Sequence, residues 1–232
     1  MKLYYDMHIH SALSPCGDED MTPNNIVNMA QLKELDIIAV TDHNSCGNVR
    51  AVMEAAQGRI RVIPGMEVET REEVHVLCYF DTPEKLEDMA RLVQDNMPKI
   101  KNKPDIFGRQ LIMDAEDNVV GEEENLLVCA SELSIYDVSR ETLARGGVFV
   151  PAHIDRASYS VLANLGFLPP DLLISGVEIT GKNVAAMSAK YADFVILTSS
   201  DAHYLENISE RVRFLDTEDK LTNKLLQILC KF

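Results

Sequence analysis

The stretch LYYDMHIH at residues 3–10 decides the fold prediction, because it joins an apolar run to two histidines that stand two positions apart. Residues two apart on a β-strand point to the same face, so His8 and His10 would leave one side of a strand at its carboxyl end. The segment SALSPCGDED follows at residues 11–20 and combines turn residues with carboxylates. One histidine pair is a weak signal, so the rest of the chain decides its meaning.

Similar apolar, β-branched runs recur along the chain and predict further strands. The expected strands are residues 3–9, 37–41, 62–68, 74–80, 148–152, 176–179 and 194–199. Helical patterns lie between most of them, over residues 23–34, 48–57, 83–94, 135–144, 185–191 and 217–229. Alternating strands and helices predict an α/β fold with a mainly parallel sheet, either open or closed as a barrel.

One region breaks this alternation. Residues 96–133 show no clean strand–helix unit, although residues 110–113 and 119–120, on either side of the turn-rich DAEDN, suggest a small β-hairpin. Long insertions are often lids or binding loops, and the alternative is a surface excursion without function. We therefore expect a single domain over residues 1–232, with a lid or insertion at about residues 96–133.

The composition restricts the class of protein. The chain is 46% hydrophobic and 25% charged, and its formal net charge is −15. Such an acidic protein is a poor nonspecific partner for nucleic acid, and the excess acid is either solvated surface or part of a cation site. No apolar run approaches ~18 residues, and the N-terminus does not read as a signal peptide, so we expect a cytoplasmic protein without membrane association. Five cysteines without a CxxC pair predict reduced thiols.

Histidines gather where the expected strands end. The six are His8, His10, His43, His75, His153 and His203. Five of them stand at or just past the carboxyl end of a strand, and His75 stands near the start of its own. Ligands collect outside the carboxyl ends of strands in parallel α/β folds, so the placement predicts one shared site. A lone histidine is more often an ordinary hydrogen-bonded residue, but the common placement favours a function for the set.

Carboxylates accompany these histidines. The acids nearest to them in the sequence are Asp18, Asp42, Glu67 and Asp201. Imidazole nitrogen and carboxylate oxygen together suit Zn²⁺, Mn²⁺ or Fe²⁺, and six imidazoles exceed the needs of a single ion. We therefore expect two or more divalent metals. Asp42 has a weaker case as a ligand, because an acid beside a ligand histidine often only orients it.

The motifs in order resemble those of the PHP (polymerase and histidinol phosphatase) family. They are HIH at 8–10, TDHN at 41–44, GMEV at 65–68, His75 in the fourth strand, PAHIDR at 151–156 and SDAH at 200–203. HxH alone is weak, but the ordered series is highly specific and covers nearly the whole chain. The resemblance implies a distorted seven-stranded (β/α)₇ barrel, similar to a TIM barrel, with a metal site at its C-terminal rim.

The resemblance also implies a set of metal ligands for two or three ions. They are His8, His10, Glu67 and Asp201 for the first metal, Glu67, His75 and His153 for the second, and His43, His203 and Asp18 for the third. The last ligand is where this sequence departs from the family pattern. Family members often carry an acid or a histidine five or six residues after the HxH motif, and here Cys16 stands six after His10. We prefer Asp18, with Cys16 as the alternative.

This site predicts hydrolysis of a phosphoester by metal-activated hydroxide. Metals roughly 3.5–4 Å apart clamp the attacking and leaving oxygens of an in-line displacement. Glu67 and Asp201 would be essential to the centre, and either His203 or metal-bound water would protonate the leaving oxygen. Phosphate recognition usually requires a cation as well. The candidate cations are Arg156, Lys182 and, from the insertion, Arg109.

Several functions fit this prediction. The leading one is hydrolysis of a small phosphomonoester of the nucleotide, sugar phosphate or histidinol phosphate type. A phosphodiesterase or nuclease of the polymerase-associated PHP type is an alternative, against which the charge of −15 argues. A noncatalytic metal-binding module for a partner protein is another. Amidohydrolase chemistry is a fourth, but we see no metal-bridging lysine at a strand end. The sequence carries no signal for an oligomeric state.

Overall fold

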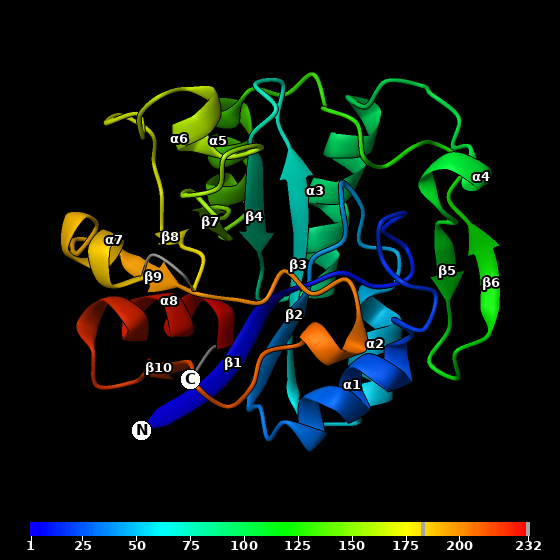
Figure 1. Ribbon diagram of the computed structural model, residues 1–232, viewed down its shortest axis with the longest axis horizontal. Helices are drawn as coiled ribbons and strands as arrows, with labels where there is room; N and C mark the ends of the chain where they lie inside the picture. Colours follow the sequence, from blue (N-terminus) through cyan, green and yellow to red (C-terminus); the bar gives the residue numbers. More distant parts are fainter. Residues whose placement is uncertain (182–183, 231–232) are drawn as a thin grey trace.

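The computed structural model describes residues 1–181 and 184–230. Its centre is a curled sheet with the strand order β10-β1-β2-β3-β4-β7 (Figure 1). Its strands are β1 (Lys2–Ile9), β2 (Ile37–Val40), β3 (Arg61–Glu69), β4 (His75–Tyr79), β7 (Val148–Pro151) and β10 (Phe214–Asp216). Two further pairs are β5 (Leu111–Met113) with β6 (Val119–Glu122), and β8 (Gly176–Glu178) with β9 (Val195–Leu197). The predicted α/β class is confirmed.

The direction of β4 differs from the prediction of a mainly parallel sheet. β1, β2 and β3 are parallel, but β4 is antiparallel to both β3 and β7. The chain passes from β3 to β4 within residues 70–74, whereas a parallel crossover needs about a dozen residues or more. The start of β4 therefore lies at the same edge as the end of β3. The three-residue β10, antiparallel to β1, was too short to be predicted.

Backbone hydrogen bonds connect the β8–β9 pair to the chain around β7 on one side and to the chain at the end of β1 on the other. On one side, Ser175 N–H donates to the Phe149 carbonyl at 2.9 Å and Ile154 N–H donates to the Glu178 carbonyl at 2.9 Å. On the other side, the segment after β9 meets β1, where His10 N–H donates to the Ala202 carbonyl at 2.9 Å. The sheet therefore curls toward closure.

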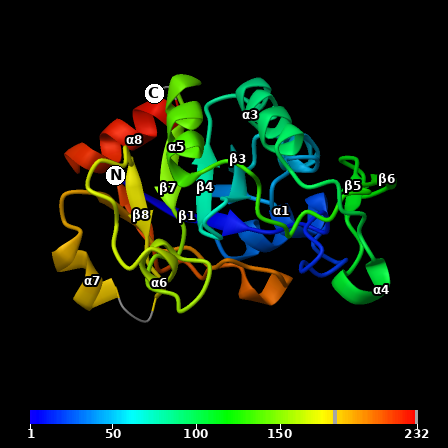
Figure 2. The ribbon, with the colours of Figure 1, turned by 90° about the horizontal axis from the view of Figure 1, so that it is seen from above.

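The helices cover the outside of the curled sheet. They are α1 (Pro23–Leu32), α2 (Val49–Ala56), α3 (Pro83–Asp95), α4 (Pro104–Phe107), α5 (Ile135–Ala144), α6 (Val161–Asn164), α7 (Val184–Lys190) and α8 (Lys220–Cys230), with a 3₁₀ turn at Leu205–Asn207. Figure 2 shows α8, α5 and α3 following one another along one side. The predicted start of α1 is confirmed, because the Thr22 hydroxyl accepts the Asn25 N–H and Pro23 takes the first helical position. None of the described helices is long and apolar enough to cross a membrane.

The predicted hairpin in the insertion is confirmed as β5 and β6. It packs against the loop that follows β1, where Leu111 N–H donates to the Ala12 carbonyl at 2.8 Å. The buried Asn48 side chain holds the hairpin from α2, since its amide donates to the Leu111 carbonyl at 3.0 Å and its oxygen accepts the Met113 N–H at 2.9 Å. These contacts fix the base of the hairpin, and its role as a lid stays a prediction.

Apolar side chains fill both faces of the sheet, and β1 changes its alternation near its end. Tyr5 and Met7 belong to the inner apolar cluster, together with Leu77 and Tyr79 of β4. The pairing of β1 with β2 is irregular between Asp6 and Ile9. Irregularities of this kind re-aim side chains, and they are over-represented beside functional sites. His8 lies within this irregular stretch and His10 follows it, and both side chains are buried.

Candidate metal centre

The six histidines meet at one edge of the sheet with two carboxylates. Three groups of described side chains bring their ligand atoms within 4.8 Å of one another. The groups are His10, His43 and His203; His8, His10 and Asp201; and His43, Glu67 and His75. His153 joins the cluster through its Nε2, which lies 3.3 Å from Glu67 Oε1.

Glu67 is the centre of this arrangement. Its carboxylate lies 3.0–3.4 Å from the nearest nitrogens of five imidazoles, those of His8, His10, His43, His75 and His153. The side chain is only 1% exposed, and burial by itself would raise its pKa. The surrounding imidazoles outweigh burial and hold the pKa of Glu67 well below its ordinary value. The carboxylate is therefore a permanent negative charge among potential ligands.

The reversed direction of β4 explains the unusual place of His75. This histidine opens β4 and pairs with Glu69 at the end of β3, so its Nδ1 lies 3.0 Å from Glu67 Oε1. Burial lowers the pKa of His75, but Glu67 and, to a smaller extent, Glu69 together outweigh burial and raise that pKa to about 9. Tyr159 stacks on its ring with centroids 4.9 Å apart. A strand that starts at the site thus supplies the same kind of ligand as strands that end there.

His8 and His10 are each held by a partner that leaves Nε2 facing the cluster. The two Nε2 atoms lie 3.2 Å apart, and Asp201 Oδ1 lies 3.3 Å from the first and 3.0 Å from the second. His8 Nδ1 lies 3.0 Å from Glu178 Oε2, and His10 Nδ1 lies 3.0 Å from the Ser14 hydroxyl. A partner on one ring nitrogen fixes the tautomer and orientation of the other.

Asp42 lies behind the cluster, and its carboxylate reaches the ring of His10 through Ser14 rather than that of the adjacent His43, for which an orienting acid was expected. Its carboxylate accepts the Ser11 N–H at 2.7 Å, the Ser11 hydroxyl at 2.6 Å and the Ser14 hydroxyl at 2.7 Å. Ser14 then contacts His10 through its own oxygen. The chain from Asp42 through Ser14 to His10 is buried throughout, so it holds the ring rigidly.

The backbone also aims two of these side chains. His153 has a φ of 28° and Asp201 a φ of 54°. Both values fall in the left-handed region that residues other than glycine rarely adopt, and such conformations concentrate at functional sites. His203 follows closely, and its Nδ1–H donates to the Asp201 carbonyl at 2.8 Å. Burial and the neighbouring His10 lower the pKa of His203.

The donor atoms fit a divalent metal. Buried polar atoms are normally hydrogen-bonded, yet His43 Nδ1, Glu67 Oε1 and His153 Nε2 are buried here without a hydrogen-bond partner. These three atoms converge on the cluster from three different strands or strand ends. Imidazole nitrogens with two carboxylates are a suitable donor set for Zn²⁺, Mn²⁺ or Fe²⁺. The described residues therefore fit the metals that the sequence predicted.

Two predicted alternatives for the last ligand lie outside the three groups. Asp18 N–H donates to the His203 carbonyl at 2.9 Å, while its carboxylate accepts the Asp20 N–H at 2.9 Å. The loop is thus tied to the site, but the Asp18 carboxylate serves a local turn. Cys16 is exposed. Neither residue belongs to one of the three ligand groups among the described side chains, so the choice between them stays a prediction.

The three candidate phosphate-binding cations have different surroundings. Arg156 Nη1 lies 2.6 Å from Asp201 Oδ2, directly beside the cluster. Arg109 pairs with Glu122 and lies 3.9 Å from Glu19, on the hairpin side of the molecule. Lys182 lies outside the described residues. The geometry brings Arg156 to the site and leaves Arg109 with surface acids.

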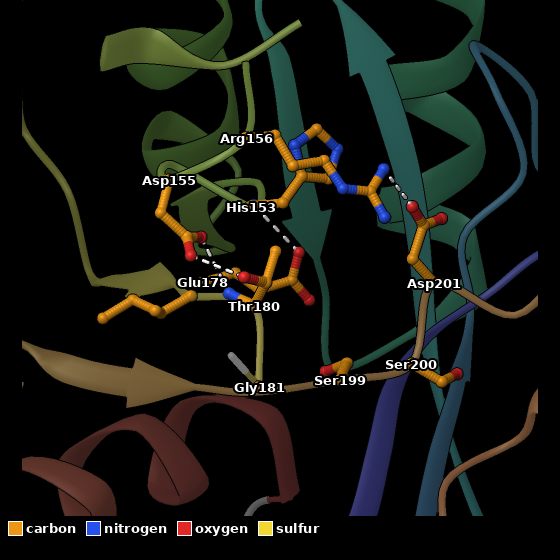
Figure 3. A pocket seen from close by; sticks show the side chains of 10 residues that line it. His153, Asp155, Arg156, Glu178, Thr180, Gly181, Ser199, Ser200 and Asp201 are labelled. Atoms are coloured by element: carbon orange, nitrogen blue, oxygen red, sulfur yellow. Dashed lines mark hydrogen bonds and ion pairs between the residues drawn. The ribbon is translucent and has the colours of Figure 1, made fainter. Parts of the chain in front are cut away.

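A cavity of about 460 Å³ opens beside the cluster. Figure 3 shows Arg156 reaching across it toward Asp201, with His153 next to them. Glu178 also lines it, and this residue was not predicted from the sequence. Its position could have identified Glu178, because it is the last residue of β8, as Glu67 stands near the end of β3. The sequence gave no other sign, since no histidine stands beside Glu178.

The curled α/β sheet and the histidine–carboxylate cluster at its edge define a candidate metal-binding protein. The chain belongs to the PHP domain family, whose model matches residues 6–223. No curated protein shows significant similarity to the chain.

Solved structures share the fold. A lesion-specific endonuclease, EndoQ from Pyrococcus furiosus, matches with a TM-score of 0.67 and 20% identity over 88% of this chain, which spans only 49% of the endonuclease. A protein from Bifidobacterium adolescentis, provisionally named a metal-dependent phosphoesterase, matches with a TM-score of 0.64 and 18% identity over 97% of this chain and 96% of its own. An amidohydrolase from Chromobacterium violaceum, with bound sulfate and no metal, matches with a TM-score of 0.60 and 18% identity over 92% of this chain and 91% of its own.

Proposed function

We propose that the protein is a metal-dependent phosphoesterase that hydrolyses a small phosphomonoester. The observation that carries the proposal is the contact of Arg156 with Asp201, because it sets a guanidinium between a candidate metal centre and an open cavity. Phosphate binding combines cations with metal ions in this way, and guanidinium geometry matches phosphoryl oxygens.

The family resemblance implies one set of ligands for each of two or three metal ions, and the three geometric groups support it in part. His8, His10 and Asp201 lie together as it implies, whereas His43 groups with Glu67 and His75 as well as with His10 and His203. The assignment of each ligand to one ion is therefore part of the proposal. When bound, divalent metals supply Lewis acidity toward phosphoryl oxygens and make water more acidic.

The residues of the chain perform the remaining tasks. Glu67 would bind metal at the centre and offset part of its positive charge. One oxygen of its carboxylate faces His43 and the other faces His75. Arg156 would bind a phosphoryl oxygen, and its ion pair with Asp201 would weaken as it does so. His203, whose side chain is 25% exposed, is the most accessible imidazole of the cluster. It would give a proton to the leaving oxygen only in an arrangement in which it does not bind a metal, so this role and its role as a ligand are alternatives.

We also infer that seven strands form a ring around this centre. They are β1, β2, β3, β4, β7, β8 and β9, and the backbone hydrogen bonds of Ser175 and Ala202 support the two joins that strand pairing leaves open. A parallel bridge between Ile9 and Ala202 supports the last join as well. In this arrangement the metal centre lies at the rim where β1, β2 and β3 end.

A nuclease-type phosphodiesterase is the principal alternative. The likeness to the endonuclease concerns the fold, and this chain spans about half of that protein. The net charge of −15 gives no support to a nucleic-acid substrate. Amide hydrolysis, as in the similarly folded amidohydrolase, and a noncatalytic role with a partner protein are further outcomes for a test.

The test is release of the alcohol from a panel of phosphomonoesters and phosphodiesters with Mn²⁺ supplied, alongside the Glu67→Gln variant, because hydrolysis of a diester leaves a phosphomonoester and frees no inorganic phosphate. We expect release from monoesters, and none from the variant. Release from diesters alone would replace the proposal by the phosphodiesterase. Lack of release from either class, by protein shown to hold its metals, would favour amide hydrolysis or a binding role.

A further inference from the structure

We infer that the cavity beside the cluster receives the alcohol part of the substrate and selects an alcohol with further hydroxyl groups, as in a sugar or polyol phosphate. This inference rests on the proposed phosphomonoesterase function. It adds which substrates are preferred and which residues select them.

The position of the cavity links it to the reacting phosphate. His153 and Asp201 line the cavity and also belong to the metal cluster. A phosphate held at the cluster by Arg156 would therefore point its ester oxygen and alcohol into this space. The volume of about 460 Å³ lies within the usual range of roughly 300–1,000 Å³ for small-ligand sites.

Glu178 gives the cavity an unused hydrogen-bond acceptor. Its Oε2 is occupied, because it lies 3.0 Å from His8 Nδ1 and accepts the His153 N–H at 3.0 Å. Its Oε1 is buried without a hydrogen-bond partner, although the residue is only 3% exposed and lines the cavity. An unsatisfied buried acceptor is unfavourable, so a donor from a ligand would be bound there at a gain.

The rest of the lining also favours hydroxyl groups. Thr180, Ser199 and Ser200 contribute hydroxyls, of which that of Thr180 already donates to Asp155 and that of Ser200 to Asp6. Ile179 is the only apolar side chain among the described residues that line the cavity. An aromatic base would need apolar or aromatic walls instead. Figure 3 shows Glu178 and Thr180 beside this space, whereas the Ser200 side chain points away from them. Asp155, Glu178 and Asp201 line the cavity together with Arg156, so a cationic alcohol is the competing donor that the test has to separate from a neutral hydroxyl.

Three phosphomonoesters of equal chain length test the inference. They are glycerol 1-phosphate, propyl phosphate and 3-aminopropyl phosphate, assayed as phosphate release by the metal-loaded protein. We expect kcat/KM for glycerol 1-phosphate to exceed that for propyl phosphate by about tenfold or more, as one hydrogen bond to a charged group supplies. Ser199→Ala, which alters the lining without touching a candidate ligand, should reduce this ratio.

Glu178→Gln should reduce the ratio most, and metal content is measured in the same sample because Glu178 also holds His8. The ratio cancels a general loss of activity, since both substrates share it. Glu69→Gln is the matched control, a buried acid near the cluster that does not line the cavity, and its ratio should equal that of the wild type.

Each contrary result has a separate meaning. Equal kcat/KM for the glycerol and propyl esters would overturn the hydroxyl selection and leave the phosphatase standing. Preference for the aminopropyl ester would overturn it in favour of a cationic alcohol. An unchanged ratio in Glu178→Gln and Ser199→Ala would remove the cavity from substrate selection. Absence of phosphate release from all three esters, by protein that hydrolyses another monoester of the panel, would overturn this inference alone, whereas absence of hydrolysis across the whole panel would overturn the proposed function and this inference with it.

Discussion

Glu67→Gln keeps the size of the side chain and removes a negative charge that lies 3.0–3.4 Å from five imidazoles. Removing one partner from a buried charged group costs about 3–5 kcal/mol, which corresponds to about a 10²- to 10⁴-fold change in an equilibrium constant. We expect the affinity for Mn²⁺ or Zn²⁺ to fall by this factor. Turnover should fall at least as far, because the metals carry the chemistry.

The assay is a calorimetric metal titration, with metal content measured after dialysis. Glu69→Gln is the matched control, since this acid is also buried at the end of β3 but approaches only His75, at 3.9 Å. Its metal affinity should change by less than about tenfold, the equivalent of 1.4 kcal/mol. Wild-type affinity in Glu67→Gln, or equal losses in the two variants, would refute the central role of Glu67.

The same variant has a consequence in the metal-free protein. Glu67, with a smaller contribution from Glu69, raises the pKa of His75 to about 9 against the effect of burial. In Glu67→Gln this pKa should therefore fall toward or below the ordinary histidine value of about 6.5. An NMR titration of the imidazole measures it, and a value that stays near 9 would show that another group holds the proton.

Three further changes have definite expected outcomes. Because His75 must lose a proton to bind metal and its pKa is about 9, metal affinity should rise with pH up to about 9 and then level; a constant affinity between pH 7 and 9 in calorimetry would contradict this. Arg156→Ala should raise KM for a phosphomonoester by about 10- to 100-fold, and Arg109→Ala should leave it near the wild-type value; steady-state kinetics that reverse this order would exchange their roles. Asp42→Asn should lower the free energy of unfolding by about 2–3 kcal/mol, since the carboxylate accepts three short hydrogen bonds. An unchanged urea midpoint would show that the network contributes little to stability.

The sequence predicted the histidine cluster because its members stand at strand ends, a position that follows from local pattern alone. It did not predict why His75 belongs there, since the direction of β4 depends on a five-residue return and on pairing with both neighbours. Glu178 was missed for a related reason. Its function depends on contacts with His8 and His153, which lie far from it in sequence.

The hairpin in the insertion was predictable from its turn, because DAEDN is a local signal. Arg109 was placed by analogy with lids, and its ion pairs with Glu122 and Glu19 could not be inferred from spacing. Asp18 shows the reverse case, a residue whose sequence position suits a metal ligand. Its carboxylate accepts the Asp20 N–H in a local turn, a contact that the sequence does not predict.

The contact between His10 and Asp201 joins residues 191 positions apart in the chain. Closing so long a loop costs conformational entropy, and such distant contacts form late and slowly in folding. A partly folded chain that lacks the segment after β9 would hold some of the imidazoles but not this carboxylate. Tight metal binding would therefore indicate that β1 and the segment after β9 have come into contact. The bound ions would then stabilise this contact, because their ligands come from both segments.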